Sequence, residues 1–195
     1  GRGLSELYGN EAGKAVVTFL RLRQQHPEVM AFHTALGQAQ LATGRTQDAL
    51  ETLEHARVLA PRNVPVTVRY GEALMQAGRA KRAHEVLLDL FNNVPPTQEQ
   101  IRLTAMAANA AGDVADAYSY MAEYHLMGGD LMLAINQLEL ALSVPSITDQ
   151  QRAKFVARLK EVHEWLPKER NRSKQPPDGQ APDGTRSPDS QRAPG

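Results

Sequence analysis

The chain has 195 residues with 22 basic and 22 acidic side chains, and its formal net charge is zero. A neutral balance argues against a nucleic-acid binder, which needs a basic surface. Because the sequence contains no cysteine, disulfides, cysteine-ligated zinc sites and thiol nucleophiles are excluded. The longest apolar run, 131–135, is far too short to span a bilayer.

A single period of 34 residues runs through most of the sequence. It relates glycines, prolines and alanines at fixed offsets: Gly44, Gly78 and Gly112; Pro27, Pro61 and Pro95; Ala15, Ala49, Ala83 and Ala117. Apolar residues follow the same spacing at Phe19, Leu53, Leu87 and Met121. A repeat of this length is typical of stacked helix pairs. We therefore predict an all-α solenoid of antiparallel helix pairs.

The repeat places the helices in chain order. A short helix around 4–8 precedes a helix within 13–27, and full helix pairs follow over about 30–63, 64–97 and 98–131. Glycine should end the first helix of each pair, since it tolerates the left-handed backbone conformation. Proline should close each unit, because it cannot continue a helix interior.

The register changes after the third pair. Gly129 follows Gly112 by only half a repeat, and Ala134 follows Ala117 by the same interval. We therefore predict that the helix over 114–127 is the second helix of one pair and the first helix of the next. A stack of helices permits this sharing, because each helix packs only on its neighbours.

The last predicted helix, about 148–166, has one apolar and one charged face. The apolar face comprises Phe155, Leu159, Val162 and Leu166, and the charged face comprises Arg152, Lys154, Arg158, Lys160, Glu161 and Glu164. This pattern predicts a C-terminal capping helix whose charged face is solvated. Thr97 with Gln100, and Thr148 with Gln151, match capping boxes at two helix starts.

Residues 168–195 differ from the rest in composition. They contain no large apolar or aromatic side chain, five prolines, and six basic against four acidic residues. Such a segment cannot bury enough apolar area to offset its chain entropy, so we predict a disordered tail. The predicted domains are therefore a repeat domain over 1–167 and the tail.

The repeats resemble the tetratricopeptide repeat, a helix pair whose length matches the period of this sequence. In such stacks the first helices line a concave surface that binds partners. The repeat register places twelve residues there: Thr34, Gln38, Leu41, Val68, Glu72, Met75, Arg102, Met106, Asn109, Ser119, Glu123 and Met127. We predict a groove for an extended or helical peptide segment. Two alternatives stay open: part of the groove packs against a further domain, or Met106 and Met127 belong to the core.

No catalytic or metal-binding pattern accompanies this predicted groove. The six histidines are scattered, and no two lie three or four residues apart, as metal ligands on one helix face would. We therefore predict neither catalytic nor metal-ligating residues, and no cofactor, in this chain. Arg102 is the single cation among the groove positions, which predicts poor binding of peptides through a terminal carboxylate in that groove.

A more specific resemblance covers about 10–167 and is strongest over 118–164. The segment AEYHLMGGDLMLAINQLELALSVPSITDQQRAKFVARLKEVHEWLPKE, with the repeats before it, resembles the C-terminal half of periplasmic zinc metalloproteases of the beta-barrel assembly-enhancing protease type. The resemblance implies an N-terminal HExxH protease domain that holds the zinc, a periplasmic location, and contacts with that domain or with outer-membrane assembly machinery. It also implies that residue 1 lies inside a larger protein.

The chain itself departs from that pattern because it contains no HExxH. His84-Glu85 is followed by Val-Leu-Leu, and His163-Glu164 by Trp-Leu-Pro, so no catalytic residue is carried over. We expect a protein–protein interaction module without a transmembrane segment that serves as the docking part of such a protease. The rivals are a free-standing repeat scaffold in cell-envelope export or pilus assembly, an enzyme acting through this chain alone, and a nucleic-acid-binding repeat protein.

Overall fold

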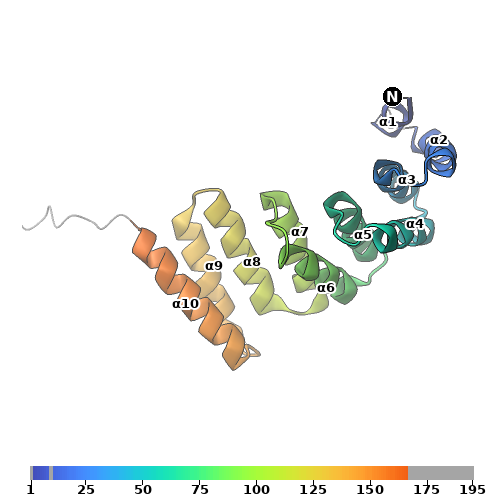
Figure 1. The fold of residues 1–195 in the computed structure, drawn as a ribbon. Coiled ribbons are helices and arrows are strands. Elements are labelled where there is room, and N and C mark those ends of the chain that lie inside the picture. Colours follow the sequence, from blue (N-terminus) through green and yellow to red (C-terminus); the bar gives the residue numbers. More distant parts are fainter. Residues whose placement is uncertain (1, 9–10, 167–195) are drawn as a thin grey trace, which may run out of the picture. The chain divides into compact units, whose positions relative to one another are not determined.

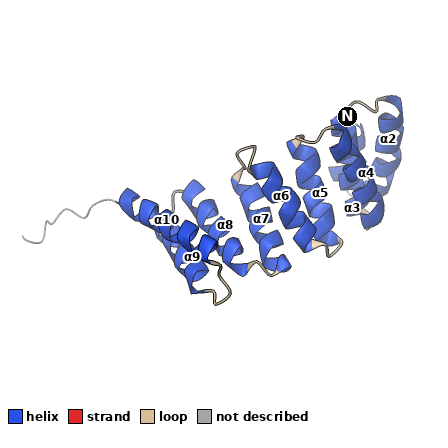
Figure 2. Cartoon of the chain, turned by 60° about the horizontal axis from the view of Figure 1, so that its bottom comes forward, coloured by secondary structure: helices blue, strands red, loops and turns tan. Residues whose placement is uncertain are grey.

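The computed structural model describes residues 2–8 and 11–166. Within these ranges the chain forms helices joined by short turns and contains no strand (Figure 2). The helices are α1 (Arg2–Tyr8), α2 (Ala12–Gln25), α3 (Met30–Ala42), α4 (Thr46–Leu59), α5 (Val64–Gln76), α6 (Ala80–Phe91), α7 (Gln98–Ala111), α8 (Val114–Met127), α9 (Leu131–Ser143) and α10 (Asp149–Trp165). The predicted tail over 168–195 lies outside the described residues.

Each helix packs on the next one in the chain, from α1 to α10 (Figure 1). The first helices of successive pairs also meet, α3 with α5 and α5 with α7. Helix α8 packs on both α7 and α9, and α10 contacts both α8 and α9. The predicted all-α solenoid and its shared helix over 114–127 are therefore confirmed.

Glycines with positive φ end the first helices, as the repeat predicts. Gly44, Gly78 and Gly112 have φ of 74°, 71° and 90°, and Gly129 has φ of 80° after the shared helix α8. Residues with a Cβ atom rarely adopt this backbone conformation. These glycines let the chain reverse direction within a few residues, which brings the two helices of a pair together.

Small residues allow the paired helices to approach closely. Ala15, Ala49 and Ala83 are fully buried at the start of the second helices. Glycines at a second repeat position, Gly3, Gly37 and Gly71, lie against Phe19, Leu53 and Leu87 of the following helix. A Cβ built on Gly37 would lie 2.6 Å from Cγ of Leu53, far inside van der Waals contact. The leucine therefore fills the space that the missing side chain leaves.

Two predicted capping boxes begin α7 and α10. The N–H of Thr97 donates to Oε1 of Gln100 at 2.9 Å, and the N–H of Gln100 donates back to Oγ1 of Thr97 at 3.4 Å. Thr148 and Gln151 exchange the same bonds at 3.0 and 3.2 Å. Each box satisfies backbone donors that the first turn of a helix leaves unpaired.

Helix α10 covers the end of the stack with buried Phe155 and Val162. The prediction that its charged face is solvated is wrong for Arg158. This side chain donates to both carboxylate oxygens of Glu123 in α8 at 2.7 Å, and to Glu161 at 2.6 Å. Its guanidinium also lies 5.1 Å from the ring centre of Trp165. The planar fork of arginine matches a carboxylate in this way, and the Glu123 contact raises the pKa of Arg158 further above its ordinary value.

None of the helices in the described ranges combines the length and the apolar character that a membrane crossing would need.

The close approach at Gly37 gives a stability prediction. Gly37→Ala should destabilise the chain by about 1–3 kcal/mol, because the added methyl group overpacks the contact with Leu53. Gly71→Ala should cost less, since its Cβ would lie 3.0 Å from the nearest Leu87 atom. The matched control is Gly13→Ala on α2, where the added Cβ would meet no atom within 4 Å beyond the local backbone. Urea unfolding measures all three, and equal stability of the Gly37 and Gly13 variants would contradict the packing argument.

The Arg158 contacts give a second prediction. Arg158→Ala should lower the free energy of unfolding by about 1–3 kcal/mol, because Glu123 loses a two-point charged partner. Relative to the wild type, hydrogen exchange in this variant should become faster in α10 and change less in α5. The exposed Arg152 on the same helix is the control, and Arg152→Ala should stay within about 0.5 kcal/mol of the wild type. Unchanged exchange in α10 would show that Arg158 does not hold this helix in place.

Candidate functional site

A cavity of about 530 Å³ lies between the first helices α3 and α5. Four of the predicted groove residues line it: Thr34, Gln38, Val68 and Glu72. The other lining residues are Met30, Ala31, Ala35, Asn63, Val64, Pro65, Arg69 and Gln100. Four of the twelve predicted groove residues therefore lie in one concavity, which we call the α3–α5 groove.

Several polar groups of the α3–α5 groove already have hydrogen-bond partners within the protein. Oγ1 of Thr34 donates to the carbonyl of Met30 at 2.9 Å, and Oδ1 of Asn63 accepts the N–H of Val66 at 3.1 Å. Arg69 donates to Glu72 at 2.6 Å, so the acidic charge in the groove is neutralised locally. The groove thus offers an apolar lining and neutral polar edges rather than a net charge.

Three of the lining residues that the sequence analysis missed follow simple spacing rules. Met30 lies four residues before Thr34, and Val64 lies four residues before Val68. Residues four apart share one helix face, so extending each predicted row by one turn toward the N-terminus would have found them. Arg69 would have followed from its i, i+3 spacing to Glu72.

Leu41 and Met75 do not line the α3–α5 groove. Both are partly buried and pack against a core cluster that includes Leu53, Leu74 and Leu87. Their places at the C-terminal ends of α3 and α5 put them next to α4 and α6, where apolar side chains gather.

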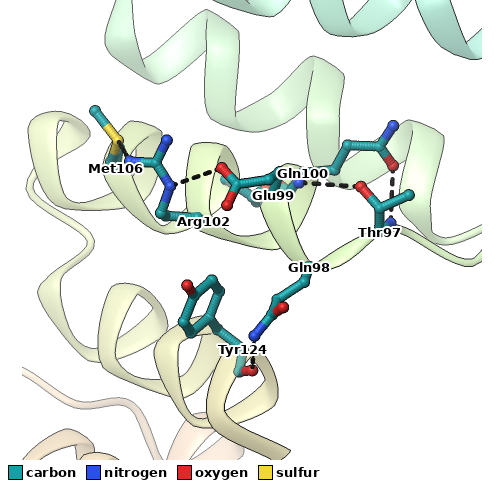
Figure 3. Close-up of polar contacts among 8 residues, drawn as sticks. Thr97, Gln98, Glu99, Gln100, Arg102, Met106 and Tyr124 are labelled. Carbon is teal, nitrogen blue, oxygen red and sulfur yellow. Dashed lines mark hydrogen bonds and ion pairs between the residues drawn. The ribbon is translucent and has the colours of Figure 1, made fainter. Parts of the chain in front are cut away.

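The predicted groove residues of α7 lie on an exposed face of that helix. Arg102 donates from Nε to Glu99 at 3.0 Å and from Nη1 to the sulfur of Met106 at 3.6 Å (Figure 3). Asn109 is exposed one turn later. Since Met106 and Met127 are 49% and 54% exposed, neither is a core residue, and the core alternative is wrong.

The three predicted residues of α8 are placed differently. Ser119 is 6% exposed, which leaves little of it for a partner, and Glu123 is held by Arg158. Met127 is exposed at the end of the helix. Helix α8 packs on α7, α9 and α10, and Met127 is the one exposed residue of this helix. Gln98 of α7 adds to this contact by donating to the carbonyl of Tyr124 at 3.1 Å (Figure 3).

Comparison with family models finds a match to part of the chain. Residues 41–107 match the tetratricopeptide repeat. No sequence among the curated proteins matches the chain.

Several solved structures share this fold. TTC0263 from Thermus thermophilus aligns with a TM-score of 0.52 at 19% identity, covering 81% of this chain and 95% of that one. MamA from Desulfovibrio magneticus RS-1 aligns with a TM-score of 0.61 at 15% identity, covering 83% and 91%. A repeat protein from Parabacteroides merdae aligns with a TM-score of 0.50 at 16% identity, covering 84% and 75%. At such identities the likeness shows the fold alone.

One partly buried polar cluster has the order carboxylate, imidazole, hydroxyl. Nδ1 of His84 lies 3.0 Å from Oδ2 of Asp113, and its Nε2 lies 3.1 Å from the hydroxyl of Tyr120. Burial, together with the charges of Asp116 and Asp113, raises the pKa of Tyr120 to about 12. A phenol with such a pKa stays protonated at neutral pH and is a poor nucleophile. We interpret the cluster as a structural link between α6 and α8. Across the described ranges, no group of three or more His, Asp or Glu side chains is placed to hold a metal ion.

The raised pKa of Tyr120 predicts a loss of stability at alkaline pH. The folded chain keeps the phenol proton up to about pH 12, whereas an unfolded tyrosine loses it near pH 10. The contribution of Tyr120 is therefore complete below pH 10 and lost as the pH rises to about 12. An absorbance titration near 295 nm should show one phenol titrating near pH 12 that is absent in Tyr120→Phe. Titration of every tyrosine near pH 10 in the folded wild type would contradict this.

Proposed function

We propose that the α3–α5 groove binds a protein segment in extended or helical form. The observation that carries this proposal is the cavity itself, which combines an apolar lining with neutral polar edges on the first helices of two repeats. Tetratricopeptide repeats form a stack whose concave surface suits elongated partners. Because Arg69 and Glu72 neutralise each other, the groove has no strong local charge. Shape complementarity and apolar burial would therefore provide most of the binding free energy.

We further propose that the whole protein is a periplasmic zinc metalloprotease of the beta-barrel assembly-enhancing type, with this chain as its docking part. The support is the sequence resemblance, strongest over 118–164. Zinc and catalysis would belong to a separate HExxH domain, and the groove would engage the substrate, the assembly machinery or that domain itself. A free-standing repeat scaffold in cell-envelope export or pilus assembly is the alternative.

The complete reading frame separates these two proposals. An HExxH helix encoded upstream of residue 1, with one zinc per protein and metal-dependent proteolysis, is the expected result. A frame without HExxH would overturn the protease proposal and favour the scaffold. Fractionation of cells that produce the tagged full-length protein tests the periplasmic location, and recovery in the cytoplasmic fraction would contradict it. Neither outcome affects the groove proposal, which is tested on the repeat domain.

The groove proposal predicts a matched pair of variants. Peptides selected against the repeat domain from a random library should lose affinity by about tenfold or more in Val68→Glu, because the new carboxylate would be buried against the peptide's apolar side chains. The control is Val17→Glu on α2, where Val17 is 68% exposed and lies outside the groove. Isothermal titration calorimetry measures both affinities. Equal affinities of the two variants would show that the selected peptides bind elsewhere.

A further inference from the structure

Three side-chain amides line the α3–α5 groove: Gln38, Asn63 and Gln100. Two of them use their oxygen to cap a helix, since Oδ1 of Asn63 accepts the N–H of Val66 at 3.1 Å and Oε1 of Gln100 accepts the N–H of Thr97 at 2.9 Å. A backbone N–H can bond only to the oxygen of an amide, so each cap determines which way its amide group is turned. Figure 3 shows the nitrogen of Gln100 on the side of the amide away from Thr97.

The amide nitrogens of Asn63 and Gln100 are unpaired and accessible. Neither nitrogen donates a hydrogen bond to any of the described residues. Among those residues, the buried side-chain polar atoms without a partner are Nδ1 of His33, Oε1 of Gln40 and Oγ1 of Thr67. The two amide nitrogens also lack a partner but are not among these buried atoms, so solvent reaches them. Each can donate two hydrogen bonds.

Helix capping explains the oxygens of these two amides but not their nitrogens. Asp caps a helix as well as Asn does, and Glu serves in a capping box as well as Gln. Helix α3 begins at Val29, one repeat before Asn63, without any side-chain cap. Gln151 forms the same capping bond with Thr148 at the start of α10, yet it does not line the groove. What distinguishes Asn63 and Gln100 is that both border one cavity.

The unpaired donors restrict what can occupy the α3–α5 groove. The charges of Arg69 and Glu72 are paired with each other, so the remaining donors in the groove are neutral amides. The matching acceptor in a protein partner is a backbone carbonyl. In a helix these carbonyls are bonded internally except for about the last four. An extended segment has carbonyls free along its whole length and binds other proteins through them.

We propose that the α3–α5 groove binds a protein segment in extended conformation, with its backbone carbonyls accepting hydrogen bonds from Nδ2 of Asn63 and Nε2 of Gln100. Successive side chains of an extended segment point to opposite sides, so apolar side chains on one side would lie on Val64 and Val68. Gln38 bonds to none of the described residues and can pair with either an N–H or a carbonyl of the segment. This proposal rests on the proposed groove function and selects the extended over the helical form.

Variants of nearly identical shape test the role of the two donors. Asn63→Asp with Gln100→Glu keeps both capping oxygens and replaces each donor by an acceptor. The probes are peptides selected against the chain from a random library, with acetylated and amidated ends. Their affinity for the double variant should fall by about tenfold or more, because carboxylate oxygens would face the peptide carbonyls. The urea midpoint should be unchanged or higher.

The matched control for the double variant is Gln151→Glu. It makes the same amide-to-carboxylate change in the same kind of helix cap, but away from the groove. Affinity of the selected peptides for this variant should stay within about twofold of the wild type. A loss as large as that of the double variant would show that added charge, rather than the missing donors, weakens binding, and would overturn the proposal.

The conformation of the bound peptide is measured directly. In peptides labelled with ¹³C, the Cα shifts should move below their random-coil values on binding, as in an extended chain. Proline placed at one interior position at a time should be tolerated at several positions. A bound helix would lose about a hundredfold in affinity at every position beyond its first turn, and shifts above the random-coil values would overturn the proposal.

The outcomes separate this proposal from the groove function on which it rests. If Val68→Glu weakens binding but the double amide variant does not, the groove binds protein segments without the carbonyl contacts, and the extended-form proposal is wrong. If Val68→Glu has no effect, both proposals fail. Binding that requires a free C-terminal carboxylate on the peptide would show that the amides hold that group instead, and would likewise overturn the proposal.

Discussion

The fold depends on how closely the two helices of each pair approach. Glycine occupies the same repeat position three times, at Gly3, Gly37 and Gly71, and each time the large side chain of the next helix fills the space that a Cβ would need. This contact fixes the separation of the helices within a pair and leaves the first helix free to meet the first helix of the next pair. The α3–α5 groove exists because α3 and α5 meet in this way.

Local charge pairing determines what kind of partner this surface can recognise. Several acidic side chains on the described surface are paired with an arginine three residues away, as in Glu72 with Arg69 and Glu99 with Arg102. Such pairs contribute little stability when exposed, but they cancel charge within one helical turn. The α3–α5 groove therefore has no strong field, and selectivity there has to come from shape and hydrogen bonding.

The sequence predicted those features that recur with the period. The helix order, the left-handed glycines and four residues lining the α3–α5 groove follow from positions one repeat apart, because the same spacing produces similar packing. Arg102, Met106 and Asn109 stand in the same register but do not line that groove. The contacts that it missed are particular to one place. Arg158 of α10 reaches back to Glu123 of α8, and no periodic rule relates the two. The α8 positions were extrapolated from the same register, yet Ser119 of this helix is buried and Glu123 is bonded to Arg158.

Departures from the repeat are therefore where specific chemistry should be sought. A residue that matches its counterparts in the other repeats serves the common packing, and its replacement affects stability first. A residue that differs, such as Gln40 where the next repeat has Leu74, carries no shared structural duty. When such a residue is buried and unpaired, the fold bears an energetic cost that the neighbouring repeat avoids with an apolar side chain.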